Sequence, residues 1–197
     1  MTREQFLTAY AEAHRIRRER DALMVMSGQA SRRPILVGED NPYSARPSDA
    51  LLPYPVKSAG YRLATTILGL SVVEYLTDFD RVNLCGTKWD DEVARKRWRL
   101  LLDGGNRTLI LLGEKVCRAA GNRDEHREAA HAAESKSPLA STMRAVRPIE
   151  FFTKGMVSYL NTIVTLPHPS GRSRVWNDPT AIPRARALVL PLIGRAP

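Results

Sequence analysis

Residues 159–178 read YLNTIVTLPHPSGRSRVWND, in which an apolar run ends in a polar loop. The run from Tyr159 to Leu166 has the character of a strand. The loop that follows it, as far as Asp178, contains a histidine, two serines, two arginines and a tryptophan. Loops at strand ends carry functional residues more often than residues needed only for packing. The stretch therefore predicts a functional loop at the end of a strand.

A second polar loop follows another apolar strand, nearer the N-terminus. Residues 34–37 form this short apolar run, and residues 38–44 read GEDNPYS. In open α/β sheets, ligands bind in a crevice beyond the carboxyl ends of the strands. Two proline-containing polar loops in this position therefore predict one shared crevice.

The rest of the chain alternates between helical and strand-like segments. Apolar strands are expected at 34–37, 81–85, 109–112 and 159–166, and helices at 2–27, 58–70, 72–76, 92–103, 114–120 and 180–192. Such alternation with apolar strands is typical of a parallel sheet with helices on both faces. The sequence therefore predicts an α/β fold around about four parallel strands.

A length of 197 residues suits one well-buried domain, and we expect a single domain over residues 1–197. Residues 1–30 are expected to form a basic amphipathic helix. Its segment 14–20, HRIRRER, is either a solvated helix face or a contact surface for a DNA backbone. Residues 121–148 contain few large apolar side chains, which predicts an exposed helix or a mobile insertion.

The composition favours a polyanionic partner. The formal net charge is +9, and 24 of the 30 basic residues are arginine. Basic side chains bind nucleic acid by releasing counterions from its phosphates. The alternative is a solvated surface in a protein from an arginine-biased genome.

Cysteine usage and hydropathy exclude several other classes. Cys85 and Cys117 are too few for a disulfide scaffold, a four-cysteine zinc site or an iron–sulfur cluster, and both are expected to be small buried side chains. No apolar run is long enough for a membrane-spanning helix, and the N-terminus is charged rather than signal-like. We therefore expect a soluble, intracellular protein in the cytoplasm.

The ordered set of loops resembles the uracil-DNA glycosylase superfamily. The resemblance rests on the Gly-x-Asp/Asn-Pro-like loop at 38–43, on Asn83 after the second strand, and on the His-Pro-Ser sequence at 168–170. It extends from about residue 33 to residue 192. It implies a three-layer α/β/α sandwich around a four-stranded parallel sheet, and a metal-independent DNA glycosylase that needs no cofactor.

The residue types suit cleavage of an N-glycosidic bond. Cleavage builds negative charge on the departing base, which a neutral His168 can stabilise by donating a hydrogen bond. A carboxylate or amide beside the sugar can position water. By its place in the family motif, Asp40 ranks first for this role, with Asn41 and Glu39 close behind. The alternative for Asp40 or Asn41 is an Asx-turn or a helix cap.

The resemblance also implies residues that bind the flipped nucleotide. Asn83 would read the edge of the base, or it only closes a strand end. Tyr43 resembles a tyrosine that excludes a 5-methyl group, although a packing role is as reasonable. Tyr54 is a candidate stacking platform. Further substrate-binding candidates are Gly38, Pro42 and Ser170.

The remaining candidates would contact DNA. Arg172, Ser173 and Arg174 would bind phosphates around the extruded nucleotide, and Arg172 or Val175 would be the wedge. Trp176 is expected to brace the loop. The resulting hypothesis is a monomeric DNA glycosylase that flips a damaged or modified base. The alternatives are an N-glycoside hydrolase or transferase acting on free nucleotides or on an unusual base, and a non-catalytic DNA-binding module.

Overall fold

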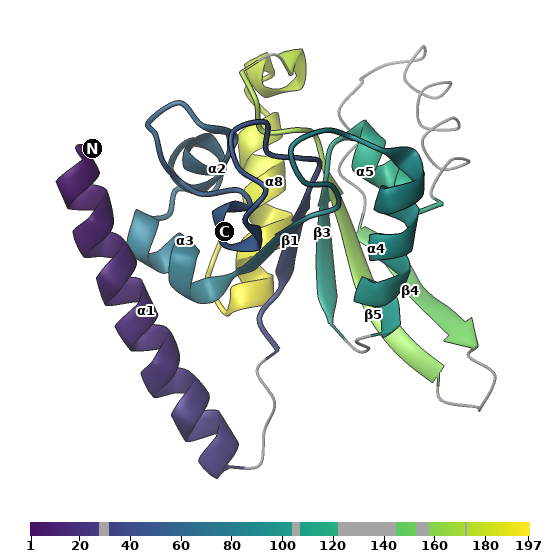
Figure 1. Ribbon diagram of the computed structural model, residues 1–197, viewed down its shortest axis with the longest axis horizontal. Coiled ribbons are helices and arrows are strands. Elements are labelled where there is room, and N and C mark those ends of the chain that lie inside the picture. Colours follow the sequence, from purple (N-terminus) through teal and green to yellow (C-terminus); the bar gives the residue numbers. More distant parts are fainter. Residues whose placement is uncertain (28–31, 104–106, 122–144, 153–157, 172) are drawn as a thin grey trace.

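The computed structural model describes residues 1–27, 32–103, 107–121, 145–152, 158–171 and 173–197. In these residues one sheet has helices packed on both of its faces (Figure 1). Its strands are β1 Ile35–Gly38, β2 Asp80–Asn83, β3 Thr108–Leu112, β4 Ala145–Phe152 and β5 Ser158–Leu166. The helical elements are η1 Pro47–Asp49, α1 Arg3–Met26, α2 Ala59–Tyr61, η2 Arg62–Ile67, α3 Val72–Asp78, α4 Asp91–Asp103, α5 Glu114–Ala119, η3 Arg174–Asn177, α8 Ala181–Val189 and η4 Leu190–Ile193.

Four of the strands are parallel and lie in the order β2-β1-β3-β5. These are the four strands that the apolar runs predict, so the α/β fold with a four-stranded parallel sheet is confirmed. The sheet also has an edge strand, β4, which pairs antiparallel with β5. Residues 145–148, which the sequence assigns to the insertion, belong to β4, while residues 122–144 of that insertion lie outside the described residues.

The composition of β4 explains why the sequence does not predict it. The strand reads AVRPIEFF and contains two charged residues and a proline. Its register with β5 shifts between Val146 and Ile149, around Pro148. Proline has no N–H for the ladder and is tolerated on an edge strand, where only one side needs pairing.

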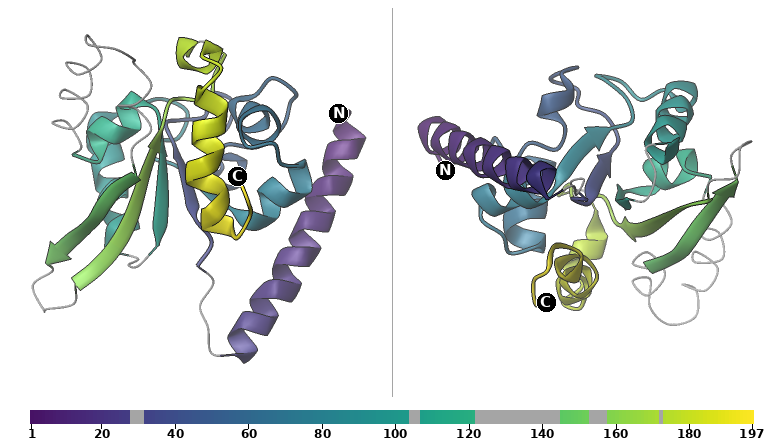
Figure 2. Two further views of the ribbon diagram at one scale, coloured as in Figure 1. Left: turned by 180° about the vertical axis from the view of Figure 1, so that it is seen from behind. Right: turned by 90° about the horizontal axis from the view of Figure 1, so that it is seen from below.

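Each face of the parallel strands contributes to its own hydrophobic core, because successive side chains of a strand point to opposite faces. Leu36 and Ile110 pack with residues of α1, α3 and α8. Val37 and Leu111 pack with residues of α4 and α5. Figure 2 shows α8 on one side of the sheet and α4 on the other, an arrangement compatible with an α/β/α sandwich.

The predicted N-terminal helix is confirmed as α1. Thr2 and Gln5 form a capping box, in which each side chain accepts a hydrogen bond from the backbone N–H of the other. Phe6 and Ala13 are buried against the rest of the domain, seven positions apart on one helix face.

Part of the basic segment 14–20 is paired within the molecule. Arg17 donates a hydrogen bond to the Asp80 carboxylate at the start of β2. Arg20 lies 2.9 Å from the Asp78 carboxylate at the end of α3. These two arginines therefore hold α1 against the domain, which is a structural role that the sequence did not predict.

The strand order places a crevice at the carboxyl ends of β1 and β3. From β1 the chain continues to β2 on one side, and β3 then pairs on the other side of β1. The connections therefore leave β1 and β3 in opposite directions, and their carboxyl ends border an open space. The polar loop after β1 and the polar loop after β5 both begin at this end of the sheet.

Candidate functional site

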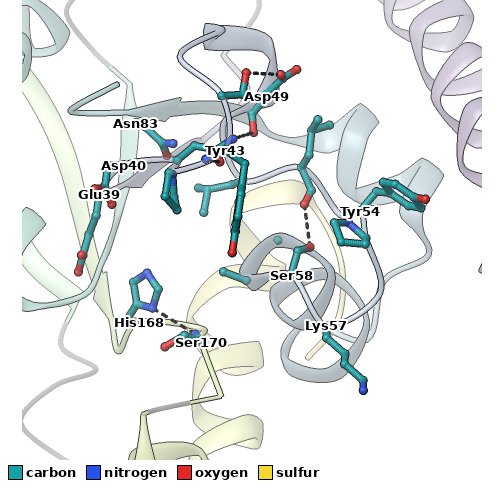
Figure 3. Close-up of a pocket in the computed structure, with 18 of the residues that line it drawn as sticks. Glu39, Asp40, Tyr43, Asp49, Tyr54, Lys57, Ser58, Asn83, His168 and Ser170 are labelled. Carbon is teal, nitrogen blue, oxygen red and sulfur yellow. Dashed lines mark hydrogen bonds between the residues drawn. The ribbon is translucent and has the colours of Figure 1, made fainter. Parts of the chain in front are cut away.

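A pocket of about 1180 Å³ opens at the carboxyl ends of the parallel strands (Figure 3). It is bounded by the loops after β1 and β5, by the last residue of β2, by the start of α5, and by the segment that leads into α2. Its lining residues are Glu39, Asp40, Asn41, Pro42, Tyr43, Ser44, Asp49, Leu51, Leu52, Tyr54, Pro55, Val56, Lys57, Ser58, Ala59, Gly60, Asn83, Lys115, His168, Ser170 and Ser173. Ten of the thirteen residues that the sequence marks as site candidates are among them.

His168 follows β5, and the local backbone fixes the orientation and the tautomer of its ring. The Ser170 backbone N–H donates a hydrogen bond to the imidazole Nδ1 at 3.2 Å. Because Nδ1 accepts this bond, a neutral ring carries its proton on Nε2. The indole N–H of buried Trp176 donates to the His168 carbonyl at 2.9 Å, so Trp176 braces the loop as the sequence predicts.

The surroundings of His168 favour its neutral form. Burial lowers the pKa of His168 below its usual value of 6.5. The negative charge of Glu39 opposes this effect, the positive charge of Lys115 adds to it, and Asp40 opposes it more weakly. The net result is a lowered pKa, so that the imidazole is uncharged at neutral pH and can donate a hydrogen bond through Nε2–H.

Glu39, the first residue after β1, reaches toward His168 (Figure 3). Its carboxylate forms an ion pair with Lys115 of α5, with 3.2 Å between Nζ and Oε2. Gly113, at the end of β3, permits this close approach. A Cβ atom there would lie 3.1 Å from Glu39 Oε1 and 3.1 Å from His168 Cβ, and the φ angle of +94° disfavours other residues.

Asn41 and Asp40 have different roles in the first loop. The Asn41 side-chain oxygen accepts from the Tyr43 backbone N–H at 3.1 Å, and its amide nitrogen donates to the Asp49 carbonyl at 3.2 Å. Both ends of the Asn41 amide therefore hold the loop, which is the Asx-turn alternative. The Asp40 carboxylate accepts no hydrogen bond from any described residue, which leaves it available to a ligand.

Asn83 ends β2 in the pocket wall. The residue is 8% exposed, and among the described residues its Oδ1 atom is buried without a hydrogen-bond partner. Gly38 lies against this amide, because a Cβ atom on Gly38 would be only 2.4 Å from Oδ1. Gly38 does not line the pocket itself, and it serves to leave space for Asn83.

The two tyrosines, Tyr43 and Tyr54, are less well placed to contact a base than the sequence suggests. Tyr43 is 94% exposed at the pocket mouth, where Pro42 is exposed as well, so its ring does not form a packed wall. Tyr54 stacks on Phe6 of α1, with 4.9 Å between ring centroids and 21° between planes. Phe6 therefore covers one face of the Tyr54 ring, which leaves at most the other face for a stacked base.

The candidates for DNA contact lie at the C-terminal part of the site. Ser170 and Ser173 line the pocket. Arg174 is exposed at the start of η3 and does not line the pocket, and Arg172 lies outside the described residues.

Sequence reasoning missed Lys115 and, apart from Tyr54, the wall formed by residues 44–58. Lys115 lies shortly after the carboxyl end of β3. Polar residues in that position identified the other two loops, so Lys115 could have been predicted in the same way. The 44–58 wall does not directly follow a strand, so it gives no such signal. Its shape depends on side-chain contacts, such as the 2.6 Å hydrogen bond from Ser44 to Asp49, that the sequence does not reveal. Leu51 and Lys57 in this wall have positive φ angles of 49° and 87°, a strained backbone that is common at functional sites.

The described residues contain no group of three histidine, cysteine or acidic side chains close enough together to hold a metal ion. Among the helices that the structure describes, none has the length and apolarity required to cross a membrane. Comparison of the chain with protein-family models, with curated proteins and with solved structures finds no match. A function for this pocket must therefore be argued from its own chemistry.

Proposed function

We propose that the protein is a DNA glycosylase with a fold and mechanism of the uracil-DNA glycosylase type. The observation that carries the proposal is the meeting of Asp40, Asn83 and His168 in one pocket, each delivered by a different strand of the parallel sheet. The order of these residues along the chain is the order that the resemblance requires. The reaction would release a flipped base and leave an abasic site.

The chemistry divides between the two ends of the glycosidic bond. As the bond breaks, negative charge develops on the base, and the Nε2–H of a neutral His168 would donate to the base oxygen that carries it. Positive charge develops on the sugar, where the Asp40 carboxylate would stabilise it and position the attacking water. Enzymes commonly place two ionisable groups in one site and give each a different role through its surroundings, as proposed here for His168 and Asp40.

Among the three residues that the first loop offers for water activation, Asp40 is the best supported. The Asn41 amide is occupied at both ends by the backbone of its own loop. The Glu39 carboxylate is paired with Lys115. Asp40 lines the pocket and has no such partner among the described residues.

Asn83 supports recognition of a nucleobase. A buried amide with an unsatisfied oxygen costs folding free energy unless a ligand or water completes its hydrogen bonds. The Watson–Crick edge of a flipped pyrimidine offers a donor and an acceptor side by side, which matches an amide. The net charge of +9 supports binding to a DNA backbone.

A second candidate function follows from the size of the pocket. A volume of about 1180 Å³ is larger than one base needs and can admit a whole nucleotide. The same residues could then cleave the N-glycosidic bond of a free nucleotide. Release of base from nucleotides, without release from DNA, would favour this reading.

The test is base release from labelled oligonucleotides, followed by alkaline cleavage at abasic sites. The panel contains uracil, hypoxanthine, xanthine, 5-hydroxymethyluracil and a G·T mismatch, each single- and double-stranded. The expected result is cleavage by the wild type that falls about 10²–10³-fold in His168→Ala. Leu100→Ala is the control, because Leu100 is 69% exposed on α4 and does not line the pocket.

Each outcome has a distinct meaning. Cleavage that is equal in the wild type and in His168→Ala would indicate a contaminating enzyme and contradict the proposal. Absence of cleavage throughout the panel, together with salt-dependent DNA binding, would favour a non-catalytic binding module.

A further inference from the structure

Lys115 is a basic side chain in the pocket that contains His168, and neither the sequence motif nor the proposed mechanism gives it a function. It projects from the first turn of α5 into the pocket that contains His168. Its ammonium group lies 3.2 Å from the Glu39 carboxylate. It also lies 5.7 Å from the centroid of the Trp89 ring, within reach of a cation–π interaction. Two independent contacts thus hold the cation in place.

The partner of Lys115 would be harmful to the proposed reaction if it were unpaired. Gly113 allows the Glu39 carboxylate to lie directly beside His168. A carboxylate in that position attracts a proton to the imidazole and repels the negative charge that develops on the departing base. A protonated imidazolium could still donate a hydrogen bond, but the ring would then act as an acid that can transfer its proton, and no longer as a neutral hydrogen-bond donor.

The charged groups that face His168 in the described structure come from two elements. Glu39 and Asp40 approach from the loop after β1, and Lys115 approaches from α5. The loop that carries His168 contributes the uncharged Ser170 N–H. Lys115 is therefore the positive charge that opposes two carboxylates.

We propose that Lys115 is a positioning residue, whose ammonium group neutralises the Glu39 carboxylate beside His168 so that the imidazole enters the reaction uncharged. Lys115 acts through Glu39 and His168 and makes no contact with the reacting bond. In this arrangement Lys115 offsets the charge of Glu39, so that burial keeps the histidine uncharged, and Asp40 remains free to serve the sugar. This inference rests on the proposed function for its purpose, but the electrostatic coupling can be measured without any substrate.

The first test is an NMR titration of the His168 ring, which reports its pKa in the free protein. Lys115→Met removes the positive charge and should raise the pKa of His168 by about one pH unit. Glu39→Gln removes the negative charge and should lower it. The double variant loses both charges and should return close to the wild type, and Lys115→Arg, which keeps the charge, should restore the wild-type value.

The control is Lys96→Met on α4. Lys96 forms an exposed ion pair with Glu92, 2.8 Å apart, and is similar to Lys115 in charge and pairing but lies outside the pocket lining. Its loss should leave the pKa of His168 unchanged. If Lys115→Met does not fold, Glu39→Gln tests the same coupling with the opposite sign.

The second test is the pH profile of base release. In Lys115→Met the acid limb of kcat/KM should move to higher pH by the same amount as the His168 titration. An unchanged His168 pKa in both single variants would overturn the inference. A shifted pKa in a protein that releases no base would support the charge control and contradict only the proposed glycosylase activity.

Discussion

The two ends of the parallel sheet differ in how their carboxylates are paired. At the amino-terminal end, the Asp80 carboxylate accepts hydrogen bonds from Arg17, Arg33 and Arg107. At the carboxyl end, the Asp40 carboxylate accepts none from the described residues. Both residues are aspartates at the ends of the same parallel sheet, so the contrast is not one of residue type.

The difference separates stability from function. Asp80 joins α1, the segment before β1 and the segment before β3, because its three arginines come from these three places. Among the described residues the Asp40 carboxylate and the nearby Asn83 Oδ1 have no hydrogen-bond partner, which is characteristic of sites that bind a ligand. The buried Asn83 oxygen also lowers stability. The amino-terminal end should therefore respond to mutation in stability, and the carboxyl end in activity.

The largest expected effect is at the carboxyl end. Asp40→Asn should reduce base release about 10²–10⁴-fold, because it removes the pocket carboxylate that has no partner among the described residues and can serve the water and the cationic sugar. The free energy of unfolding should not fall, since the wild-type carboxylate has no hydrogen bond to lose with any residue that the structure describes. Single-turnover kinetics and urea denaturation measure the two quantities on one preparation.

Glu39→Gln is the matched comparison for Asp40→Asn. Its carboxylate is already neutralised by Lys115, so we expect base release at neutral pH to change less than tenfold. If Glu39→Gln were the inactive variant and Asp40→Asn the active one, the assignment of roles within the first loop would be reversed.

The second effect is at the amino-terminal end. Asp80→Asn should lower the free energy of unfolding by about 2–3 kcal/mol, because three partly buried arginines lose their shared counter-charge. Base release by the folded protein should be unchanged. The control is Glu19→Gln, which removes an exposed pair with Arg15 and should cost less than about 0.5 kcal/mol in urea denaturation. A large loss of activity in folded Asp80→Asn would contradict the assignment of stability to the amino-terminal end of the sheet and of activity to the carboxyl end.

The sequence predicts much of the carboxyl end because its features are local. Apolar strands followed by polar loops identify His168, Asp40 and Asn83 without knowledge of any contact, and the strand order then brings them together. The amino-terminal end depends on contacts between distant segments, such as Arg107 with Asp80. No periodicity marks an arginine that pairs across the sheet, so this network could not be predicted.

The same limit applies within the pocket. The composition of the first loop permits Glu39, Asp40 or Asn41 as the water-activating residue, and only side-chain contacts distinguish them. Glu39 is paired with Lys115, which comes from a helix that follows a different strand. Residue type and spacing therefore identify the loop, while the partners of each side chain identify its role.

A third, smaller effect should come from Gly38→Ala. A Cβ atom there would lie 2.4 Å from Asn83 Oδ1, so the amide must move. We expect discrimination between bases, measured as a ratio of kcat/KM values, to fall about tenfold, and stability to fall by about 1 kcal/mol. Gly86→Ala at the same end of the sheet is the control, because its Cβ would meet only Ala45 Cβ at 3.9 Å. Equal discrimination between bases in the two variants would show that Asn83 does not take part in base recognition.

The smallest effect should be in the pH dependence of stability. Burial alone would raise the pKa of Asp80, but the hydrogen bond from Arg107 and the charges of Arg17 and Arg33 outweigh it, and the pKa lies below its usual 3.8. A depressed carboxylate pKa stabilises the fold above the unfolded-state pKa, and this stabilisation is lost as pH falls through the folded-state pKa. The urea midpoint of the wild type should therefore fall below pH 3.8, and that of Asp80→Asn should fall less steeply. The difference in slope is small because other carboxylates also contribute, such as Glu74, whose pKa Arg195 and Ser71 lower to about 2. Identical slopes would show that the arginines do not depend on the charge of Asp80, and the contrast between the two ends of the sheet would then be one of hydrogen bonding alone.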